Sequence, residues 1–277
     1  MTKLLNKFHL KVLRAILKLS LYSPIAPLYF LLGELPIEAT LHLDVLNLFW
    51  NIWSNPHTMT FKVLQYLLIM AKDNSATWAA HIRLIFQLYS LPCPITLLAS
   101  TPWTKKRWKN HIEAAVLSYH EAYWRSKAAT NRKLRFFNVT TIGLSGRPHP
   151  ILGWVKSTHD AVIIRPQIRM LAGDYQTYLN LSIERGMEPY CRICLPYVST
   201  GNLPQDENLV HLLTQCRGTY DTRSRIMPEL LNLVSQHLPS SSLLDSPTLE
   251  EVAQFLLDCT SLNLKNGLRI SPSHSNK

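Results

Sequence analysis

Four residues of the chain have the types and the spacing of ligands to one metal ion. They are Cys191, Cys194, His211 and Cys216, in the pattern C-x2-C-x16-H-x4-C. We expect a structural zinc site, because zinc in such sites is held in a tetrahedron by four thiolate and imidazole ligands, and a Cys-x-x-Cys turn supplies two of them. Protein ligands would fill all four positions and leave none for an activated water, so the site is expected to stabilise structure rather than to catalyse. The alternative is three buried thiols beside an unrelated histidine.

The five-residue step from His211 to Cys216 constrains the backbone between them. The run 206–216 has a helical pattern, yet residues five apart point about 140° away from one another on a regular α-helix. The two side chains can share a metal only if the helix loosens or ends before Cys216. Gly218, just beyond, is of the residue type that commonly ends a helix.

Positive charge dominates the chain, which carries 29 Lys and Arg against 18 Asp and Glu, a net charge of +11. The natural partners of such a surface are polyanions, with nucleic acid first and an anionic membrane second. The predicted nucleic-acid contacts are Lys105, Lys106, Arg107, Lys109, Arg132, Lys133, Arg135, Arg165, Arg169, Arg192, Arg217, Arg223 and Arg225. The alternatives are a solvated basic face at 105–109 and, for the arginines near the cysteines, a role in supporting the metal ligands.

Signals for catalysis are weak. His120-Glu121 begins an HExxH-like string, but Trp124 stands where the second histidine would be. No P-loop lysine accompanies the glycines further along. We therefore expect no enzymatic activity. The two remaining cysteines, Cys93 and Cys259, are expected to be buried thiols of a reduced, intracellular protein in the nucleus or cytoplasm.

The hydrophobic pattern is helical almost throughout, and a composition of 47% hydrophobic and 17% charged residues excludes wholesale disorder. The predicted fold class is mainly α: a helical bundle followed by a small zinc-stapled helical module, with at most one short β-hairpin or strand pair. The expected helices are an N-terminal one with an apolar stripe from Leu5 to Leu17, then 27–33, 37–53, 59–72, 77–91, 101–129 with Thr101 as N-cap, 165–175, 220–237 and 248–260, and the expected strand is 136–142.

The expected organisation has four segments. They are a helical domain at 1–100, a basic helix with its connection at 101–185, the CCHC module at 186–237, and a linker, last helix and tail at 238–277. Lysines interrupt the first apolar stretches and prolines the next one, so we expect neither a targeting segment nor a membrane partner.

Seven short motifs occur in a fixed order along most of the chain. They are FLLGELPI at 30–37, WSNP at 53–56, GRPHP at 146–150, RPQIRMLAGDY at 165–175, CRIC at 191–194, HLLTQC at 211–216 and YDTRSRI at 220–226. As an ordered set they resemble the C-terminal part of the large polyprotein of non-LTR (LINE-type) retrotransposons, the region that follows the reverse-transcriptase palm.

The resemblance implies a helical thumb and its extension in the first hundred or so residues. It implies that the rest is a cysteine–histidine segment that helps to hold element RNA or target DNA, with the four ligands carried over. The spacer before His211 is longer than in many members of the family. The palm's Tyr-x-Asp-Asp-type turn and the endonuclease are absent, so the chain is expected to have no polymerase activity, and a separate polymerase domain is a candidate partner. The alternatives are a protein-interaction scaffold, a zinc hydrolase, and a decayed fragment without selected function.

Overall fold

The computed structural model describes residues 2–70, 77–135, 137, 143–144, 146–153, 155–175, 188–194, 196, 206–237, 253 and 257. The residues it describes are mainly helical and include no strand, only one antiparallel bridge between Tyr190 and Asp206. The predicted mainly α fold class is therefore confirmed. The predicted strand 136–142 lies outside the described residues except for Phe137, which is buried.

The chain divides into two compact units, which we describe separately. The first comprises Met1–Leu21, Ile25–Asn131 and Ile142–Gly153. The second comprises Tyr22–Pro24, Arg132–Thr141 and Trp154–Lys277. The long helix that we expected in a separate segment, 101–185, packs within the first unit.

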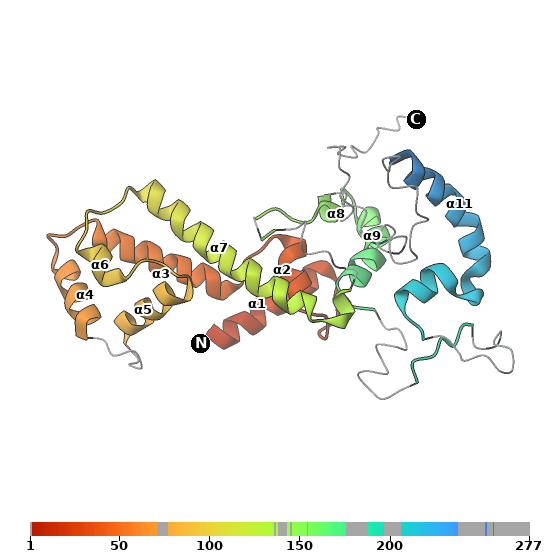
Figure 1. Ribbon diagram of the computed structural model, residues 1–277, viewed down its shortest axis with the longest axis horizontal. Coiled ribbons are helices and arrows are strands. Elements are labelled where there is room, and N and C mark those ends of the chain that lie inside the picture. The colour runs from red at the N-terminus through yellow and green to blue at the C-terminus, as the bar shows by residue number, and fades with distance from the viewer. Residues whose placement is uncertain are drawn as a thin grey trace. The chain divides into compact units, whose positions relative to one another are not determined.

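The helices of the first unit are α1 (Thr2–Leu17), α2 (Ala26–Leu32), α3 (Ile37–Trp53), α4 (Met59–Met70), α5 (Trp78–Leu88), α6 (Pro94–Leu98), α7 (Lys105–Ala129) and α8 (Pro150–Gly153) (Figure 1). In the second unit the elements are the short 3-10 helix η1 (Arg132–Leu134), α9 (Thr158–Leu171), the π-helical turn η3 (His211–Gln215), the 3-10 turn η4 (Arg217–Thr219) and α11 (Tyr220–His237). The predicted helices 37–53 and 220–237 match α3 and α11 in both bounds, and 27–33, 59–72 and 77–91 correspond to α2, α4 and α5.

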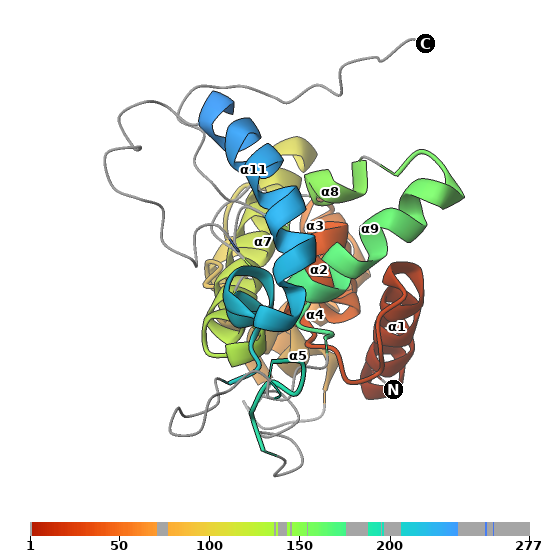
Figure 2. The same cartoon turned by 90° about the vertical axis from the view of Figure 1, so that its right-hand side faces the viewer.

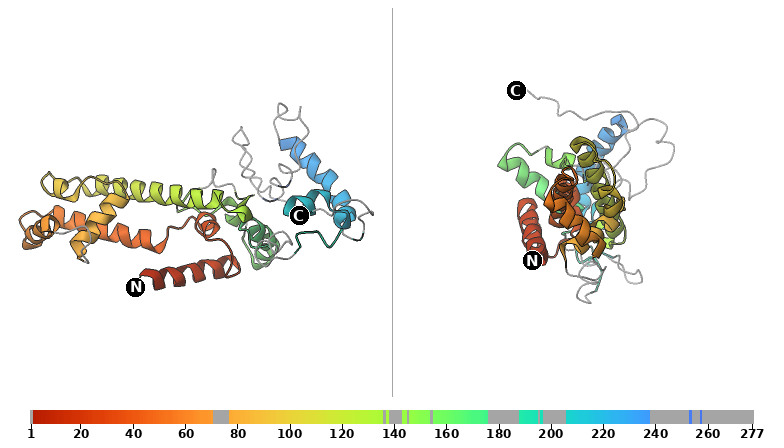
Figure 3. Two further views of the ribbon diagram at one scale, coloured as in Figure 1. Left: turned by 60° about the horizontal axis from the view of Figure 1, so that its bottom comes forward. Right: turned by 90° about the vertical axis from the view of Figure 1, so that its left-hand side faces the viewer.

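Aromatic side chains hold α7 against α3, and the two helices run side by side (Figures 1 and 3). The rings of Trp53 and Trp108 meet edge to face with centroids 5.7 Å apart, and Phe49 lies 4.9 Å from Phe86 of α5. These rings are buried almost completely. The indole N–H of Trp108 donates to the carbonyl of Leu46 at 3.2 Å, so its one polar group is satisfied inside the core. Trp108 thus belongs to the core of the first unit.

The start of α7 differs from the prediction. The N-cap is Thr104, whose hydroxyl accepts from the N–H of Arg107, and not Thr101. The carbonyl of Trp103 accepts a hydrogen bond from the indole of Trp50 at 2.9 Å. This hydrogen bond between α3 and the residue just before the cap is present where the chain is not yet helical, so the helix starts at Thr104 and not at Thr101.

The structure contains a helix that the sequence did not predict, α6, which lies before this non-helical segment. Pro94 stands in its first turn, where proline is tolerated, and therefore does not break a helix.

Helix α9 begins earlier than the predicted 165–175. Ser157 and Asp160 form a capping box, in which each side chain accepts from the backbone N–H of the other residue. This box starts the helix a full two turns before Pro166, which therefore lies inside α9. Of the predicted helix 248–260, only Ala253 and Leu257 are described, and both are helical and buried.

One expectation about burial is wrong. Cys93 is exposed rather than buried, because it stands at the N-terminal end of the short helix α6.

The apolar stripe of α1 is only partly buried. Leu13 and Leu17 are buried, whereas the side chains of Phe8 and Ile16 are 67% and 60% exposed. Among the described helices, none has both the length and the apolar character needed to cross a membrane.

Gly33 ends α2 at the point where the segment 146–149 crosses it. Gly33 has a left-handed φ of 67°, its carbonyl accepts from the N–H of Gly146 at 3.0 Å, and the N–H of His149 donates to Leu31 at 2.8 Å. A Cβ at position 33 would lie 2.8 Å from the backbone nitrogen of Arg147, and closer still to its carbonyl oxygen. Gly146 is also left-handed, with φ 72°, but a Cβ there would meet nothing within 4 Å.

These two glycines form a matched pair for substitution. Gly146→Ala should lower the free energy of unfolding of the first unit by about 1 kcal/mol, the cost of a left-handed alanine. Gly33→Ala should lower it by about 1–3 kcal/mol more, because the methyl group overlaps backbone that cannot rotate away. Urea unfolding followed by tryptophan fluorescence measures both, since six of the seven tryptophans lie in this unit. Equal losses in the two variants would contradict the close crossing.

Candidate metal centre

The Cys191–Cys194 knuckle and the segment that carries the other two ligands are held together by backbone pairing. Tyr190 forms the antiparallel bridge to Asp206, and the N–H of Glu207 donates to the carbonyl of Pro189 at 2.7 Å. The knuckle follows directly on one side of this pairing, and the helical segment of His211 follows on the other. The two segments that flank the long spacer between Cys194 and His211 are therefore held side by side.

A π-helical turn solves the angular problem of the five-residue step. The segment His211–Gln215 is π-helical, and the N–H of Cys216 donates to the carbonyl of His211, five residues earlier, at 2.7 Å. One π turn brings residues five apart onto one face, where a regular α-helix would separate them. Cys216 then leaves the helix with φ −59° and ψ 124°. The prediction that the regular helix gives way before Cys216 is confirmed.

Gly218 has a different role from the predicted one. It lies in η4, between the π turn and α11, and it is not among the glycines with a left-handed φ. Helix α11, which follows η4, is drawn in blue in Figure 2. A Cβ at this position would overlap the side chain of Ile193 and lie 3.0 Å from the Ile193 carbonyl oxygen. Glycine is therefore needed for the close approach of η4 to the knuckle, and it does not act as a helix stop.

The four ligand atoms lie close together, and two of their separations match those of a tetrahedral site. The sulfurs of Cys191 and Cys216 are 3.7 Å apart, Cys194 Sγ lies 3.4 Å from His211 Nε2, and all four atoms lie within 4.8 Å of one another. Tetrahedral bonds of about 2.3 Å to sulfur and 2.0–2.1 Å to nitrogen give edges of about 3.8 Å and 3.6 Å. All four residues are buried. The cluster therefore fits a metal ion.

Burial makes this pocket unfavourable for charge in the absence of a cation. Burial raises the pKa of Cys191 to about 12, with backbone N–H groups opposing the shift and the neighbouring thiols of Cys194 and Cys216 adding to it. Burial also lowers the pKa of His211, although the carboxylate of Glu207 raises it, and the nearby Arg223 lowers it further. A bound divalent cation would compensate the charge of thiolates that the pocket otherwise disfavours.

Residues around the ligands fix their backbone. The guanidinium of Arg223 donates to the carbonyl of Cys216 at 3.0 Å, and the hydroxyl of Thr219 donates to the carbonyls of Leu212 and Cys216. The side-chain oxygen of Asn208 accepts from the N–H of His211 at 2.9 Å. Neither Asn208 nor the buried Glu207 was predicted as a site residue, although an Asp-Glu-Asn run before an apolar helical pattern is a signal for a helix start.

The structure distributes the predicted nucleic-acid contacts over both units. Lys105, Lys106, Arg107 and Lys109 belong to α7 of the first unit, and the remaining nine belong to the second. Around the metal cluster, the described residues 188–194 and 206–229 carry four arginines but five acidic residues. Two of these arginines bond to local backbone carbonyls, Arg223 to Cys216 and Arg225 to Asp221. In α9, Arg169 pairs with Asp174 at 3.2 Å.

The charge excess is concentrated in the first unit. That unit holds 15 of the 29 basic and 6 of the 18 acidic residues, a net charge of +9, whereas the second holds 14 and 12, a net charge of +2. At the start of α7 the guanidinium of Arg107 lies 4.4 Å from the ring centroid of Trp103, and Lys105 lies 5.9 Å from that of Trp50. No acidic residue stands in the first turn of α7.

Comparison with known proteins gives no relative. No family model matches the chain, and neither do any curated proteins or solved structures.

Metal content and thiol reactivity test the centre directly. We expect one tightly bound metal ion per purified chain and a much lower affinity in Cys191→Ser and in Cys216→Ser, so that these variants lose the ion during purification, because each removes one of the four protein ligands. Cys93→Ser is the matched control and should keep the ion, since Cys93 is exposed and lies outside the cluster. A thiol reagent should reach the three cysteines of the cluster only after chelation. Equal metal content in Cys191→Ser and Cys93→Ser would exclude the site.

The close approach at Gly218 gives a second test. Gly218→Ala should weaken metal binding by about 1–3 kcal/mol, because the new methyl group pushes η4 away from the knuckle. Adding Ile193→Ala should restore part of the loss by removing the side chain that is overlapped. Gly153→Ala, where a Cβ would meet nothing within 4 Å, is the control. Affinities measured by competition with a chelator should rank in that order, and no rescue by Ile193→Ala would contradict this packing.

Proposed function

We propose that the metal held by the second unit is zinc and that its role is structural. Three thiolates and an imidazole at tetrahedral separations are a typical zinc ligand set, and four protein ligands leave no open position for catalysis. Zinc binding in isolated peptides of this kind contributes about 10–16 kcal/mol at neutral pH, enough to decide whether a small module folds. The proposal is supported by the distances of 3.7 Å and 3.4 Å within a buried cluster.

We further propose that the protein binds nucleic acid through phosphate contacts. The observation that carries this proposal is the start of α7, where Lys105, Lys106, Arg107 and Lys109 gather on the unit with a net charge of +9. The N-terminus of a helix is already positive, because its first N–H groups have no partner within the helix. Four cations without a first-turn carboxylate are therefore unfavourable alone and are relieved by an anion.

The surroundings of these cations suit a nucleic-acid backbone. Trp103 and Trp50 lie beneath Arg107 and Lys105 and restrict the cationic groups. Among the residues that the structure describes, Lys109 is paired with the exposed Glu113, at 3.6 Å, and an exposed pair of this kind is weak. The nine predicted contacts in the second unit stay predictions, and the bonds of Arg223 and Arg225 to backbone favour a local role for those two.

The origin that we propose is a LINE-type element fragment that follows the polymerase palm and lacks polymerase activity. Its support is the ordered set of motifs in the sequence, including the four ligands.

A second candidate function, a protein-interaction scaffold, is favoured by apolar side chains that stay exposed on two helices of the first unit. These are Leu4, Phe8 and Ile16 on α1 and Met59, Tyr66, Ile69 and Met70 on α4.

The salt dependence of binding distinguishes the two functions. We expect the affinity for a labelled DNA duplex, measured by fluorescence anisotropy, to fall steeply with salt, because each phosphate contact releases counterions and contributes about 0.9 to the logarithmic slope. The combined variant Lys105→Ala, Lys106→Ala, Lys109→Ala should reduce the slope by up to about 2.7, and it should weaken binding to different sequences equally. A parallel series with single-stranded RNA shows which nucleic acid is preferred.

The control is Lys3→Ala, Lys7→Ala, Lys11→Ala, which removes the same charge from exposed positions of α1 in the same unit. It should leave most of the slope intact. If both triple variants reduce binding equally, the interaction follows net charge and is not located at α7. Affinity that does not change with salt would exclude phosphate contacts and leave the interaction scaffold.

A further inference from the structure

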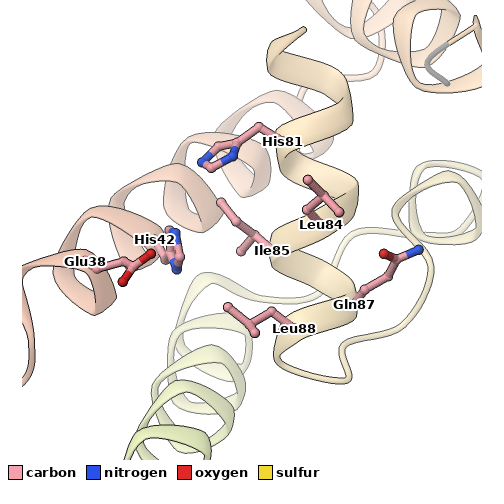
Figure 4. Close-up of a pocket in the computed structure, with 7 residues that line it drawn as sticks. All are labelled: Glu38, His42, His81, Leu84, Ile85, Gln87 and Leu88. Carbon is pink, nitrogen blue, oxygen red and sulfur yellow. The ribbon is translucent and has the colours of Figure 1, made fainter. Parts of the chain in front are cut away.

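A groove between α3 and α5 gathers side chains that bind metals. It has a volume of about 500 Å³ and lies within the first unit (Figure 4). Helix α3 contributes Glu38 and His42, and α5 contributes His81 opposite them. The remaining lining residues are Leu84, Ile85, Gln87 and Leu88. The groove therefore presents two imidazoles and one carboxylate above an apolar floor.

The three polar side chains converge from two helices. Glu38 and His42 are four residues apart on α3, so they share one face of the helix. The rings of His42 and His81 meet edge to face with centroids 5.8 Å apart. Among the described residues, the side chains of Glu38 and His81 have no hydrogen-bond or ion-pair partner, and both residues are exposed. Their ligand atoms are thus available to a ligand in the groove.

The ring of His42 is held in the orientation typical of a metal ligand. Its Nδ1 is hydrogen-bonded to the hydroxyl of Tyr89 at 2.8 Å, and that hydroxyl is hydrogen-bonded in turn to Nε2 of His120 at 3.1 Å. All three side chains are buried. Histidines that bind metals use one ring nitrogen for the metal, while the other is fixed by a partner of this kind. The nitrogen of His42 that remains is Nε2, on a residue that lines the groove.

We propose that Glu38, His42 and His81 bind a divalent transition-metal ion at this groove, with water in the remaining positions. Two imidazoles that share one ion at 2.0–2.1 Å have ring centroids about 5 Å apart. The observed 5.8 Å is close to that value. The three side chains are not yet as close together as the ligands of the cysteine cluster, so binding requires the exposed side chains of His81 and Glu38 to rotate toward His42.

The donor set selects the class of ion. Two nitrogens and one carboxylate oxygen favour Zn²⁺, Co²⁺, Ni²⁺ or Cu²⁺. Ca²⁺ and Mg²⁺ prefer sites made of oxygen alone, so they should not compete. The groove site also differs from the cysteine cluster in lacking thiolates. A metal at the groove can therefore be told apart from one at the cluster by its absorption spectrum.

Titration of the full chain with Co²⁺ tests the site. The cysteine cluster is first loaded with one equivalent of zinc, which thiolates hold against cobalt. We expect one further equivalent of Co²⁺ to bind, giving the absorption of cobalt bound to nitrogen and oxygen without the charge-transfer band of a cobalt–thiolate bond. Excess Mg²⁺ should leave this binding unchanged.

Two variants of exposed ligands identify the site without disturbing the core. His81→Gln and Glu38→Gln should each weaken the second equivalent about tenfold or more, since loss of a direct ligand costs no less than loss of a supporting residue. The control His57→Gln removes an exposed histidine outside the groove and should bind as the unsubstituted chain does. The proposal is overturned if no second equivalent binds, if His81→Gln binds it unchanged, or if Mg²⁺ displaces it.

Discussion

The second unit depends on keeping three thiols and one imidazole out of water at contact distance. The buried apolar cluster around them consists of the three cysteines, with Leu212 packed against it. So small a cluster by itself stabilises the chain around the ligands only weakly, although the second unit has further buried apolar residues, such as Ile164, Leu171 and Leu257. The metal ion that we propose would add to this stability, and the π turn and the contact of Gly218 with Ile193 both serve to bring the four ligand atoms within 4.8 Å.

The first unit is stabilised by a large apolar core. Its core joins α3 to α7 through interlocking aromatic rings, with Phe49, Trp53 and Trp108 almost fully buried. Packing of this kind stabilises the unit, because each large ring removes a large apolar area from water and the indole N–H groups of Trp53 and Trp108 find carbonyl partners. We therefore expect the two units to respond to different changes, the first to substitutions in its core and the second to removal of the metal ion that we propose for the cysteine cluster.

Sequence spacing was sufficient for features that depend on local pattern. The bounds of α3 and α11 and the type of all four ligands follow from periodicity and residue type. Features that depend on tertiary contacts did not follow. Thr101 and Thr104 are equally good N-caps in isolation, and Thr104 is the cap in a chain where the Trp103 carbonyl bonds to Trp50. Gly218 has the type of a helix stop, and only the position of Ile193 shows why glycine is required.

Most of the excess positive charge lies in the first unit, whereas the cysteine–histidine cluster lies in the second. A net charge of +11 and an arginine-rich cysteine motif favoured one basic metal module, but the fold puts +9 of that charge in the first unit. Around the cluster, five acidic residues balance four arginines, and a divalent ion with three thiolates would carry a charge of −1. A surface of that composition attracts phosphate weakly. The metal centre is thus better suited to folding its own unit, and the contacts with a polyanion are better sought at the start of α7.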